Sequence, residues 1–324
     1  MCISPRPRKT TRPCTASTGG SGTSWWARAR MPMARPSAST LKLSIQARKA
    51  HAQRARNEVE PRGVGHIREG AVRAMAIIAV ANQKGGSGKT TTAVNLAAAL
   101  AELAKPVLLV DCDAQSNATF WSGIEYDDGH ASMAEVLARQ ATVAEVARGT
   151  SFGYTIAPAS TRLVEADATM AGMMARETVL KEALPQGYNW TIIDCPPSAG
   201  IVTQNALVAA DYVLLPVPCD HLALEGAQQL LRTVREVRNR LNPDLDVLGI
   251  VPTFHTRRYR LANEALEMMK RLGPAVFDTN IRETVRIKEA PGSRSPLTHL
   301  PASAGSEDYR NLAKEVIRRV KERE

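Results

Sequence analysis

Short apolar runs rich in Val, Ile and Leu alternate with Ala-rich stretches along the chain from residue 75 onward. Most of the stretches between the runs follow a helical spacing, so the pattern predicts strands separated by helices. Strand, crossover and strand in repetition predict an α/β fold with a doubly wound, mostly parallel sheet, whose ligand binds at the carboxyl ends of the strands. The expected strands are residues 77–81, 107–111, 154–157, 191–194, 212–217 and 247–251.

The first 74 residues show no sustained hydrophobic period and are rich in Arg, Ser, Pro and Gly, which predicts disorder. Such a segment could be a basic arm that contacts DNA, a targeting segment, or upstream sequence translated from a wrongly assigned start. We favour the last, because a compact pattern begins abruptly at Met75. We therefore expect a disordered basic extension over residues 1–74 and one domain over residues 75–324.

The net charge of +10 belongs to that extension. Residues 1–74 contain 15 basic and 3 acidic residues, which leaves 27 basic and 29 acidic residues in 75–324. Any DNA contact of the domain must therefore come from a local basic patch. The sequence has neither an apolar run of about 20 residues nor the apolar core of a secretory signal, which predicts a soluble, cytosolic protein. Its five cysteines form no CxxC pair, and we expect Cys112 and Cys195 to be small buried side chains in a reducing compartment.

A glycine-rich loop with two lysines follows the first predicted strand and precedes a helical run, which is the context of a phosphate-binding loop. Its backbone N–H groups and the helix N-terminus would surround phosphates, Lys89 would bridge the β- and γ-phosphates, and the Thr90 hydroxyl would ligate Mg²⁺. The general P-loop pattern is not met, because Gln83 stands where the first glycine belongs and Lys84 adds a second lysine. The loop resembles the deviant Walker A motif of the ParA/MinD family of ATPases. The nucleotide-binding residues that follow are Lys84, Gly85, Gly86, Gly88, Lys89, Thr90 and Thr91.

Two further segments carry acidic residues at the ends of predicted strands. Residues 111–119 resemble the family's switch I, with Ala114 and Ser116 in place of proline and glycine, a change expected to make this switch more flexible. The resemblance implies that Asp113 helps to orient the attacking water and that Asp111 supports the metal shell, whereas both acids could instead cap the next turn. Residues 189–198 resemble the Walker B and switch II segment, which makes Asp194 a Mg²⁺ ligand through water.

Segments 204–211, 215–219 and 224–226 also match the ParA pattern, so the resemblance covers residues 75–324. It implies that Pro252 lies against the adenine of ATP and that Lys84 of each subunit reaches the phosphates of the other in an ATP-dependent homodimer. It further implies slow, partner-stimulated ATP hydrolysis, a ParB-type partner, nonspecific DNA binding and association with the nucleoid. The catalytic residues would be Lys84, Lys89 and Asp113.

The DNA-binding prediction rests on Arg232, Arg235 and Arg238 of one helix together with Arg257 and Arg258, with Arg232, Arg235 and Arg257 as the expected contacts. A helical period predicts that Arg232 and Arg235 point away from the buried side of their helix, although a solvated basic face is the alternative interpretation. The expected buried side consists of Leu230, Leu231, Val234, Val237 and Leu241.

Three other classes of protein share parts of this pattern. A MinD-like membrane ATPase that positions the division machinery would need a basic amphipathic helix at the C-terminus, but the stripe of Tyr309, Leu312, Val316 and Val320 indicates a packing helix. An iron–sulfur relative would need cysteine contexts that do not occur. An amidotransferase-type synthase would carry an extra glutaminase domain or substrate pocket, for which we expect no room. We therefore expect no membrane contact.

Overall fold

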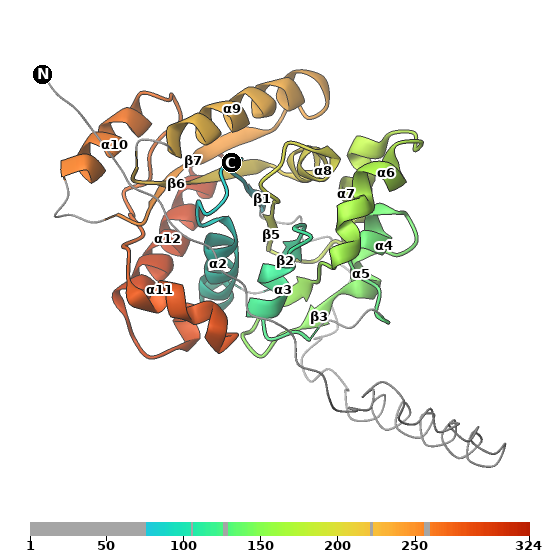
Figure 1. Ribbon diagram of the computed structural model, residues 1–324, viewed down its shortest axis with the longest axis horizontal. Coiled ribbons are helices and arrows are strands. Elements are labelled where there is room, and N and C mark those ends of the chain that lie inside the picture. Colours follow the sequence, from blue (N-terminus) through green and yellow to red (C-terminus); the bar gives the residue numbers. More distant parts are fainter. Residues whose placement is uncertain (1–75, 105, 126–128, 221–222, 256–259) are drawn as a thin grey trace, which may run out of the picture. The chain divides into compact units, whose positions relative to one another are not determined.

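The apolar runs of the sequence form one seven-stranded sheet in the computed structural model (Figure 1), which describes residues 76–104, 106–125, 129–220, 223–255 and 260–324. The strands are β1 (Ala76–Val80), β2 (Val107–Asp111), β3 (Arg148–Gly149), β4 (Thr155–Ala157), β5 (Trp190–Asp194), β6 (Tyr212–Pro218) and β7 (Asp246–Thr253). Their order across the sheet is β3-β4-β2-β5-β1-β6-β7. All neighbouring strands are parallel except β3 and β4. The predicted doubly wound sheet is therefore confirmed.

The helices up to α9 lie in the connections between strands, whereas α10, α11 and α12 follow the last strand. The α-helices are α2 (Lys89–Leu103), α3 (Asn117–Trp121), α4 (Met133–Leu137), α5 (Val143–Val146), α6 (Ala166–Met170), α7 (Val179–Ala183), α8 (Ile201–Ala209), α9 (Ala223–Arg240), α10 (Arg260–Lys270), α11 (Val285–Glu289) and α12 (Ala304–Lys321). The 3₁₀ turns are η1 (Thr161–Glu165), η2 (Arg176–Thr178), η3 (Ala290–Ser293) and η4 (Leu297–His299). The predictions for residues 1–74 lie outside the described part of the chain.

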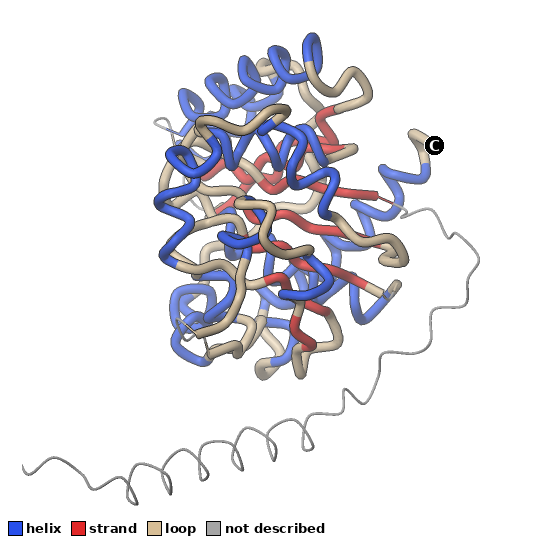
Figure 2. The backbone as a smooth tube through the Cα atoms, turned by 90° about the vertical axis from the view of Figure 1, so that its right-hand side faces the viewer, coloured by secondary structure: helices blue, strands red, loops and turns tan. Residues whose placement is uncertain are grey.

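Helices cover both faces of the sheet, and Figure 2 shows the strands between them. Along β1, Ile78 and Val80 pack with α2 and α12, whereas Ala79 faces the opposite side with α8 and α9. Alternate side chains of a strand point to opposite faces, so a strand covered on both faces must be apolar throughout. This explains why the strands appeared as continuous apolar runs in the sequence.

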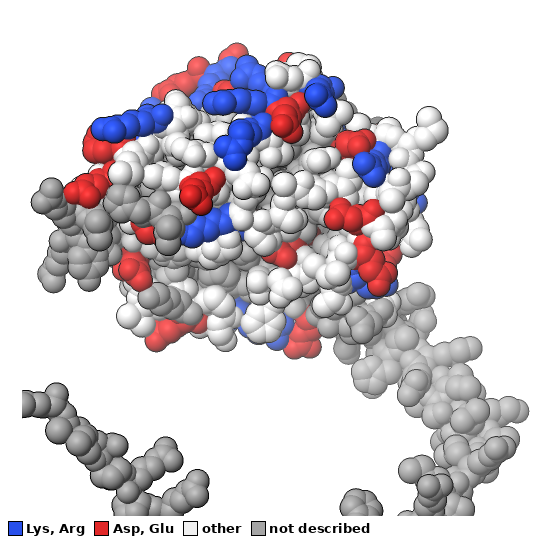
Figure 3. All heavy atoms as spheres, turned by 45° about the horizontal axis from the view of Figure 1, so that its top comes forward, with Lys and Arg blue, Asp and Glu red and all other residues white. Residues whose placement is uncertain are grey.

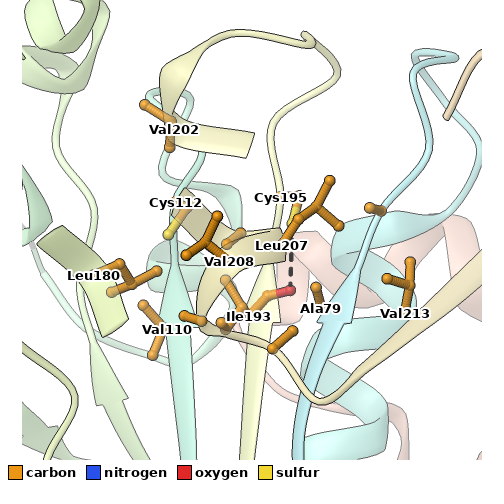
Figure 4. Close-up of a cluster of buried hydrophobic side chains, with 14 of the residues drawn as sticks. Ala79, Val110, Cys112, Leu180, Ile193, Cys195, Val202, Leu207, Val208 and Val213 are labelled. Atoms are coloured by element: carbon orange, nitrogen blue, oxygen red, sulfur yellow. Dashed lines mark hydrogen bonds between the residues drawn. The ribbon is translucent and has the colours of Figure 1, made fainter. Parts of the chain in front are cut away.

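The core on the α8 side contains the two cysteines at the ends of β2 and β5 (Figure 4). Cys112 and Cys195 are buried, and the Cys195 thiol lies 3.9 Å from the carbonyl oxygen of Ile193. Leu207 and Val208 of α8 pack in the same cluster. The prediction that both cysteines are small buried side chains is confirmed.

Two helices test the predicted buried faces. Leu230, Leu231, Val234 and Val237 of α9 are buried as expected, but Leu241 is 42% exposed because α9 ends at Arg240 and the helical period no longer applies. The stripe of α12 is buried at every predicted position, and α12 packs against α2. No helix in the described ranges is both long and apolar enough to cross a bilayer.

The sequence pattern did not predict β3, which has only two residues and pairs antiparallel with β4 at the edge of the sheet. A period of two cannot be recognised in two residues. Near the opposite edge, β6 lies between β1 and β7 and contains Pro216 and Pro218, which a strand paired on both sides could not accommodate because proline lacks an N–H donor. Beyond Leu214, β6 pairs only with β7, so the prolines do not interrupt a second ladder.

Candidate active site

The glycine-rich loop joins the carboxyl end of β1 to the first turn of α2. Gly86 and Gly88 adopt φ values of 71° and 87°, in the left-handed region that glycine enters without steric cost. Gly88 precedes the first helical residue, and its carbonyl oxygen accepts the N–H of Thr92 at 2.8 Å. The free N–H groups of the first turn therefore face the loop, which is the arrangement that binds phosphate.

Lys89 begins α2 and is only 6% exposed. Its ammonium donates one long hydrogen bond, 3.4 Å, to the carbonyl oxygen of Lys84. Burial lowers the pKa of Lys89, while the negative charge of Asp194 is the largest influence that opposes this change. A buried ammonium with so little compensation provides a strong site for an anion.

Asp194 ends β5 and is completely buried. Within the described ranges, no group donates a hydrogen bond with good geometry to either of its carboxylate oxygens. Burial, followed by the neighbouring charge of Asp111, raises the pKa of Asp194 well above the ordinary aspartate value, although Thr90 and Lys89 oppose this shift. A buried carboxylate without donors fits a bound cation, and oxygen ligands are those that Mg²⁺ prefers.

Asp111 lies beside Asp194 in the register of β2 and β5, but its environment differs. One oxygen accepts the hydroxyl and the N–H of Thr119 at 2.7 and 2.8 Å, and the other accepts the N–H of Asp113 at 3.1 Å. Burial nevertheless raises the pKa of Asp111 to about 6. Asp111 thus holds the switch I turn and α3 in place, which is the capping alternative, and its role in the metal shell stays a prediction.

Asp113 is half-buried and accepts the N–H of Gln115 at 3.0 Å. A cavity of about 160 Å³ lies beside it, lined also by Pro196 and Ser198 of the segment after β5. Ser116, at the family's glycine position, adopts φ 53°, a conformation that costs a non-glycine residue about 1 kcal/mol. The turn that carries Asp113 is therefore strained by the glycine-to-serine difference, and the structure brings Asp113 to the same edge as Lys89 and Asp194.

Lys84 does not join that buried cluster. Its ammonium forms an ion pair with Asp220, 3.0 Å away, and the two side chains are 30% and 52% exposed. Asp220 follows β6 and was not predicted, because an isolated acid after a strand gives no signal in the sequence.

The predicted adenine contact, Pro252, is buried in β7. The next residue, Thr253, donates its hydroxyl to the carbonyl oxygen of Ser87 at 3.0 Å. Phe254 adopts φ 55° and lies against Gly88, where an added Cβ would be 3.4 Å from its ring. Thr253 belongs to the segment 251–253 that the resemblance placed against the adenine, whereas the sequence did not identify Phe254. Both residues bring the end of β7 onto the phosphate loop.

Among the predicted DNA-binding residues, Arg232 and Arg235 are exposed on α9, whereas Arg257 lies outside the described residues. In Figure 3, which brings the α9 side of Figure 1 forward, basic side chains gather at the top of the view with acidic ones among them. Arg238, on the same helix, forms an ion pair with Asp246 at 3.9 Å. The outward direction of Arg232 and Arg235 agrees with the helical period.

Comparison with known proteins finds one matching family model and several relatives that share the name Soj. Residues 75–247 match the family described as an AAA domain. The chain is 44% identical over 246 residues to the Bacillus subtilis sporulation initiation inhibitor protein Soj, which covers 74% of this chain and 97% of that protein. It is also 44% identical over 248 residues to the Thermus thermophilus chromosome-partitioning ATPase Soj, covering 76% and 96%.

A solved structure named cobyrinic acid a,c-diamide synthase, from Mycobacterium smegmatis with bound ADP and magnesium, superposes with a TM-score of 0.68. It is 36% identical, and the match covers 76% of this chain and 96% of that one. Because a chain with a synthase name is matched over almost its whole length, chain length alone does not exclude a synthase, contrary to the expectation from the sequence.

Proposed function

The chain belongs to the ParA/Soj family of chromosome-partitioning ATPases, and we propose that it is an ATP-gated dimer that binds DNA and takes part in DNA segregation. The observation that carries the proposal is the pair of buried, poorly compensated charges at the phosphate loop, Lys89 and Asp194. A structural ion pair would have its hydrogen bonds satisfied. Buried charges with so few hydrogen bonds instead support a site for a bound anion together with a cation.

ATP and Mg²⁺ fit these two charges. Lys89, the glycine backbone and the first turn of α2 would hold the phosphates, while Thr90 and Asp194 would hold the metal. Bound Mg²⁺ supplies positive charge that offsets the charge of the transferred phosphoryl group. Asp113, beside its cavity, would orient the attacking water. The related structure crystallised with ADP and magnesium supports this choice of ligands.

Lys84 supports the proposed dimerisation. Its ion pair with Asp220 is exposed, and exposed pairs contribute only about 0–1 kcal/mol. Release of Lys84 toward a phosphate of a second subunit would therefore cost little free energy. ATP would thus join two subunits by supplying a stronger partner for Lys84 than Asp220 provides.

The proposed DNA surface is the exposed basic side of α9. Two copies of Arg232 and Arg235 on one dimer would neutralise more phosphates at once than a monomer can, so DNA binding would require ATP. A ParB-type protein would stimulate hydrolysis and release the dimer, and the protein would associate with the nucleoid between these events. The buried apolar face of α12 favours this proposal over a membrane ATPase.

Co-sedimentation of the full-length chain with nonspecific duplex DNA or with anionic liposomes tests the proposal. Each mixture contains ATP, ADP or no nucleotide, and Lys84→Ala and Lys89→Ala are compared with the wild type. We expect ATP-dependent sedimentation with DNA only, with ATP binding lost in Lys89→Ala and dimerisation alone lost in Lys84→Ala. Binding to liposomes without binding to DNA would contradict the proposal and favour a membrane ATPase.

The dependence of DNA binding on salt concentration tests whether the basic side of α9 contacts DNA. Each phosphate contact contributes about −0.9 to the slope of log K against log salt concentration. Arg235→Ala should therefore flatten the slope by roughly 2 per dimer, and an exposed arginine on another surface, Arg139, provides the matched control variant Arg139→Ala. An unchanged slope in Arg235→Ala would remove α9 from the DNA interface.

A further inference from the structure

The three residues before the glycine loop, Asn82–Lys84, pack directly against α9. A Cβ added at Gly226, in the first turn of α9, would lie 2.8 Å from the Asn82 side-chain oxygen. It would lie 2.9 Å from the Cβ of Lys84 and 3.0 Å from the Lys84 backbone nitrogen. Only glycine permits this approach, so the α9 backbone and the Lys84 backbone are in van der Waals contact.

A hydrogen bond joins the same two segments farther along α9. The side-chain N–H of Gln83 donates to the Thr233 hydroxyl at 3.2 Å, and that hydroxyl lies 3.3 Å from the Gln229 carbonyl oxygen, to which it donates. Gly226 and Thr233 are seven residues apart, about two helical turns, and so lie on the same side of α9. Gln83 occupies the position at which the general P-loop pattern has glycine, and glycine could not form this bond.

Lys84 is held from two further directions. Its backbone N–H donates to the Asn82 side-chain oxygen at 3.0 Å, and the Asn82 amide donates to the Pro216 carbonyl oxygen of β6 at 2.8 Å. Its ammonium contacts Asp220, as described above. The Lys84 backbone therefore cannot shift without moving either Asn82 or the helix that touches it.

The outer side of this helix carries the exposed Arg232 and Arg235, while Leu230 and Val234 are buried in the core. One rigid helix thus contacts the phosphate loop with one side and presents basic side chains on another. We propose that the Gln83–Thr233 hydrogen bond and the Gly226 contact position Lys84, and that they couple the nucleotide state of the loop to the orientation of α9. The consequence for DNA rests on the proposed function, whereas the coupling of the loop to α9 does not.

The test uses the full-length chain and two variants that break the contacts differently. Thr233→Val keeps the shape but removes the hydroxyl, and Gly226→Ala introduces the close Cβ. Matched controls are Thr169→Val, at an exposed position on α6, and Gly172→Ala, where an added Cβ meets nothing within 4 Å. The measured quantities are ATP affinity, the ATP-dependent dimerisation constant and amide hydrogen exchange in α9 with ATP and with ADP.

We expect Thr233→Val to bind ATP within twofold of the wild type but to dimerise about 3- to 10-fold more weakly, which corresponds to one lost hydrogen bond. Gln83→Ala should have a similar effect, and the double variant should be little worse than either single variant, because both remove the same bond. The difference in α9 exchange between ATP and ADP should shrink in both variants. If the Gln83–Thr233 hydrogen bond only stabilised the fold, its loss would lower the stability of the protein equally with ATP and with ADP.

Unchanged dimerisation and an unchanged nucleotide-dependent exchange difference in Thr233→Val would overturn the inference. If Gly226→Ala does not fold, Thr233→Val alone decides. If the wild type shows α9 exchange that depends on nucleotide but no binding to DNA, the proposed function fails while the coupling stands. ATP-dependent DNA binding in both proteins, together with dimerisation and α9 exchange that are the same in wild type and Thr233→Val, would leave the proposed function intact and refute the coupling.

Discussion

Two buried carboxylates in this molecule have opposite environments. Asp194, at the end of β5, has no hydrogen-bond donor of good geometry in the described part of the chain. Glu315, on α12, accepts the N–H groups of Asp278 and Thr279 at 3.0 and 2.9 Å and forms an ion pair with Arg319 at 2.8 Å. Both side chains are less than a tenth exposed. Burial therefore does not distinguish the two groups; their partners do.

The pKa values of the two groups shift in opposite directions as a result. Burial raises the pKa of Asp194 well above its usual value. Burial also acts to raise the pKa of Glu315, but the hydrogen bonds from Thr279 and Asp278 and the charge of Arg319 hold it below the usual value. A buried carboxylate with hydrogen-bond donors in the folded protein stabilises the fold. A buried carboxylate without such donors can instead gain interactions when a ligand binds.

The largest expected effect follows from removing the unsatisfied charge. Asp194→Asn should reduce Mg²⁺-dependent ATP hydrolysis by at least about 100-fold, because the proposed metal site loses its buried negative charge. The thermal midpoint without nucleotide should stay equal or rise, because the variant no longer buries an uncompensated charge. Steady-state ATPase assays and calorimetry measure the two quantities. A clear fall in the midpoint would mean that Asp194 has a structural partner in the folded state.

A change at Glu315, which has hydrogen-bond partners, should affect stability and not activity. Glu315→Gln should lower the free energy of unfolding by about 2 kcal/mol, because Arg319 and the two backbone donors lose their charged acceptor. ATP hydrolysis per folded molecule should stay within twofold of the wild type, since Glu315 lies on α12 and not among the loops of the site. Urea denaturation gives the free energy. Normal stability together with lost activity would remove the contrast between the two sites.

The dependence of stability on pH should sharpen the contrast. The pKa of Asp194 is higher in the folded than in the unfolded protein, so the folded state binds the proton more tightly. The resulting contribution to the free energy of unfolding is fully present below the unfolded pKa of about 3.8 and is lost as pH rises through the folded pKa. In the absence of Mg²⁺, the thermal midpoint of Asp194→Asn should therefore exceed that of the wild type by a growing margin above about pH 4. Addition of Mg²⁺ and ATP should reverse this margin, because the wild-type carboxylate then gains its partner.

Glu315 serves as a control, because its pKa shift makes stability depend on pH in the opposite direction. Its lowered folded pKa contributes stability that is present above the unfolded value of about 4.5 and is lost as pH falls through the folded pKa. The advantage of the wild type over Glu315→Gln should therefore shrink below about pH 4.5. If the stability of the Asp194 and Glu315 variants depended on pH in the same way, the hydrogen-bond and ion-pair partners would not control the pKa values of these two carboxylates.

The smallest expected effect concerns an exposed pair. Asp220→Asn frees Lys84 from a contact that contributes about 0–1 kcal/mol, so ATP-dependent dimerisation should tighten by no more than about 5-fold for each of the two subunits. High salt should reduce the difference from the wild type, because exposed charges are screened. Sedimentation velocity gives the dimerisation constant, and Asp244→Asn, at an exposed acid in the turn after α9, is the control. Weaker dimerisation in Asp220→Asn would show that Asp220 helps to hold the dimer together.

The sequence was sufficient to predict every strand of the sheet except β3 and to select the candidate residues of the site. Continuous apolar runs identify strands buried on both faces, and the glycine loop with its two lysines is a local pattern between a strand and a helix. The ends of β1, β2 and β5 were therefore expected to bring Lys89, Asp113 and Asp194 to one edge. These features depend on neighbours in the chain, which is why they can be recognised without coordinates.

Tertiary structure alone decided which of these groups already have partners. Asp111 and Asp194 look equivalent at the ends of their strands, but only Asp111 receives the hydrogen bonds of Thr119, eight residues away. The contacts of Lys84 with Asp220 and of Gln83 with Thr233 join residues more than 130 positions apart. No periodicity or motif records such pairs, because they depend on how separate elements pack and not on local preference.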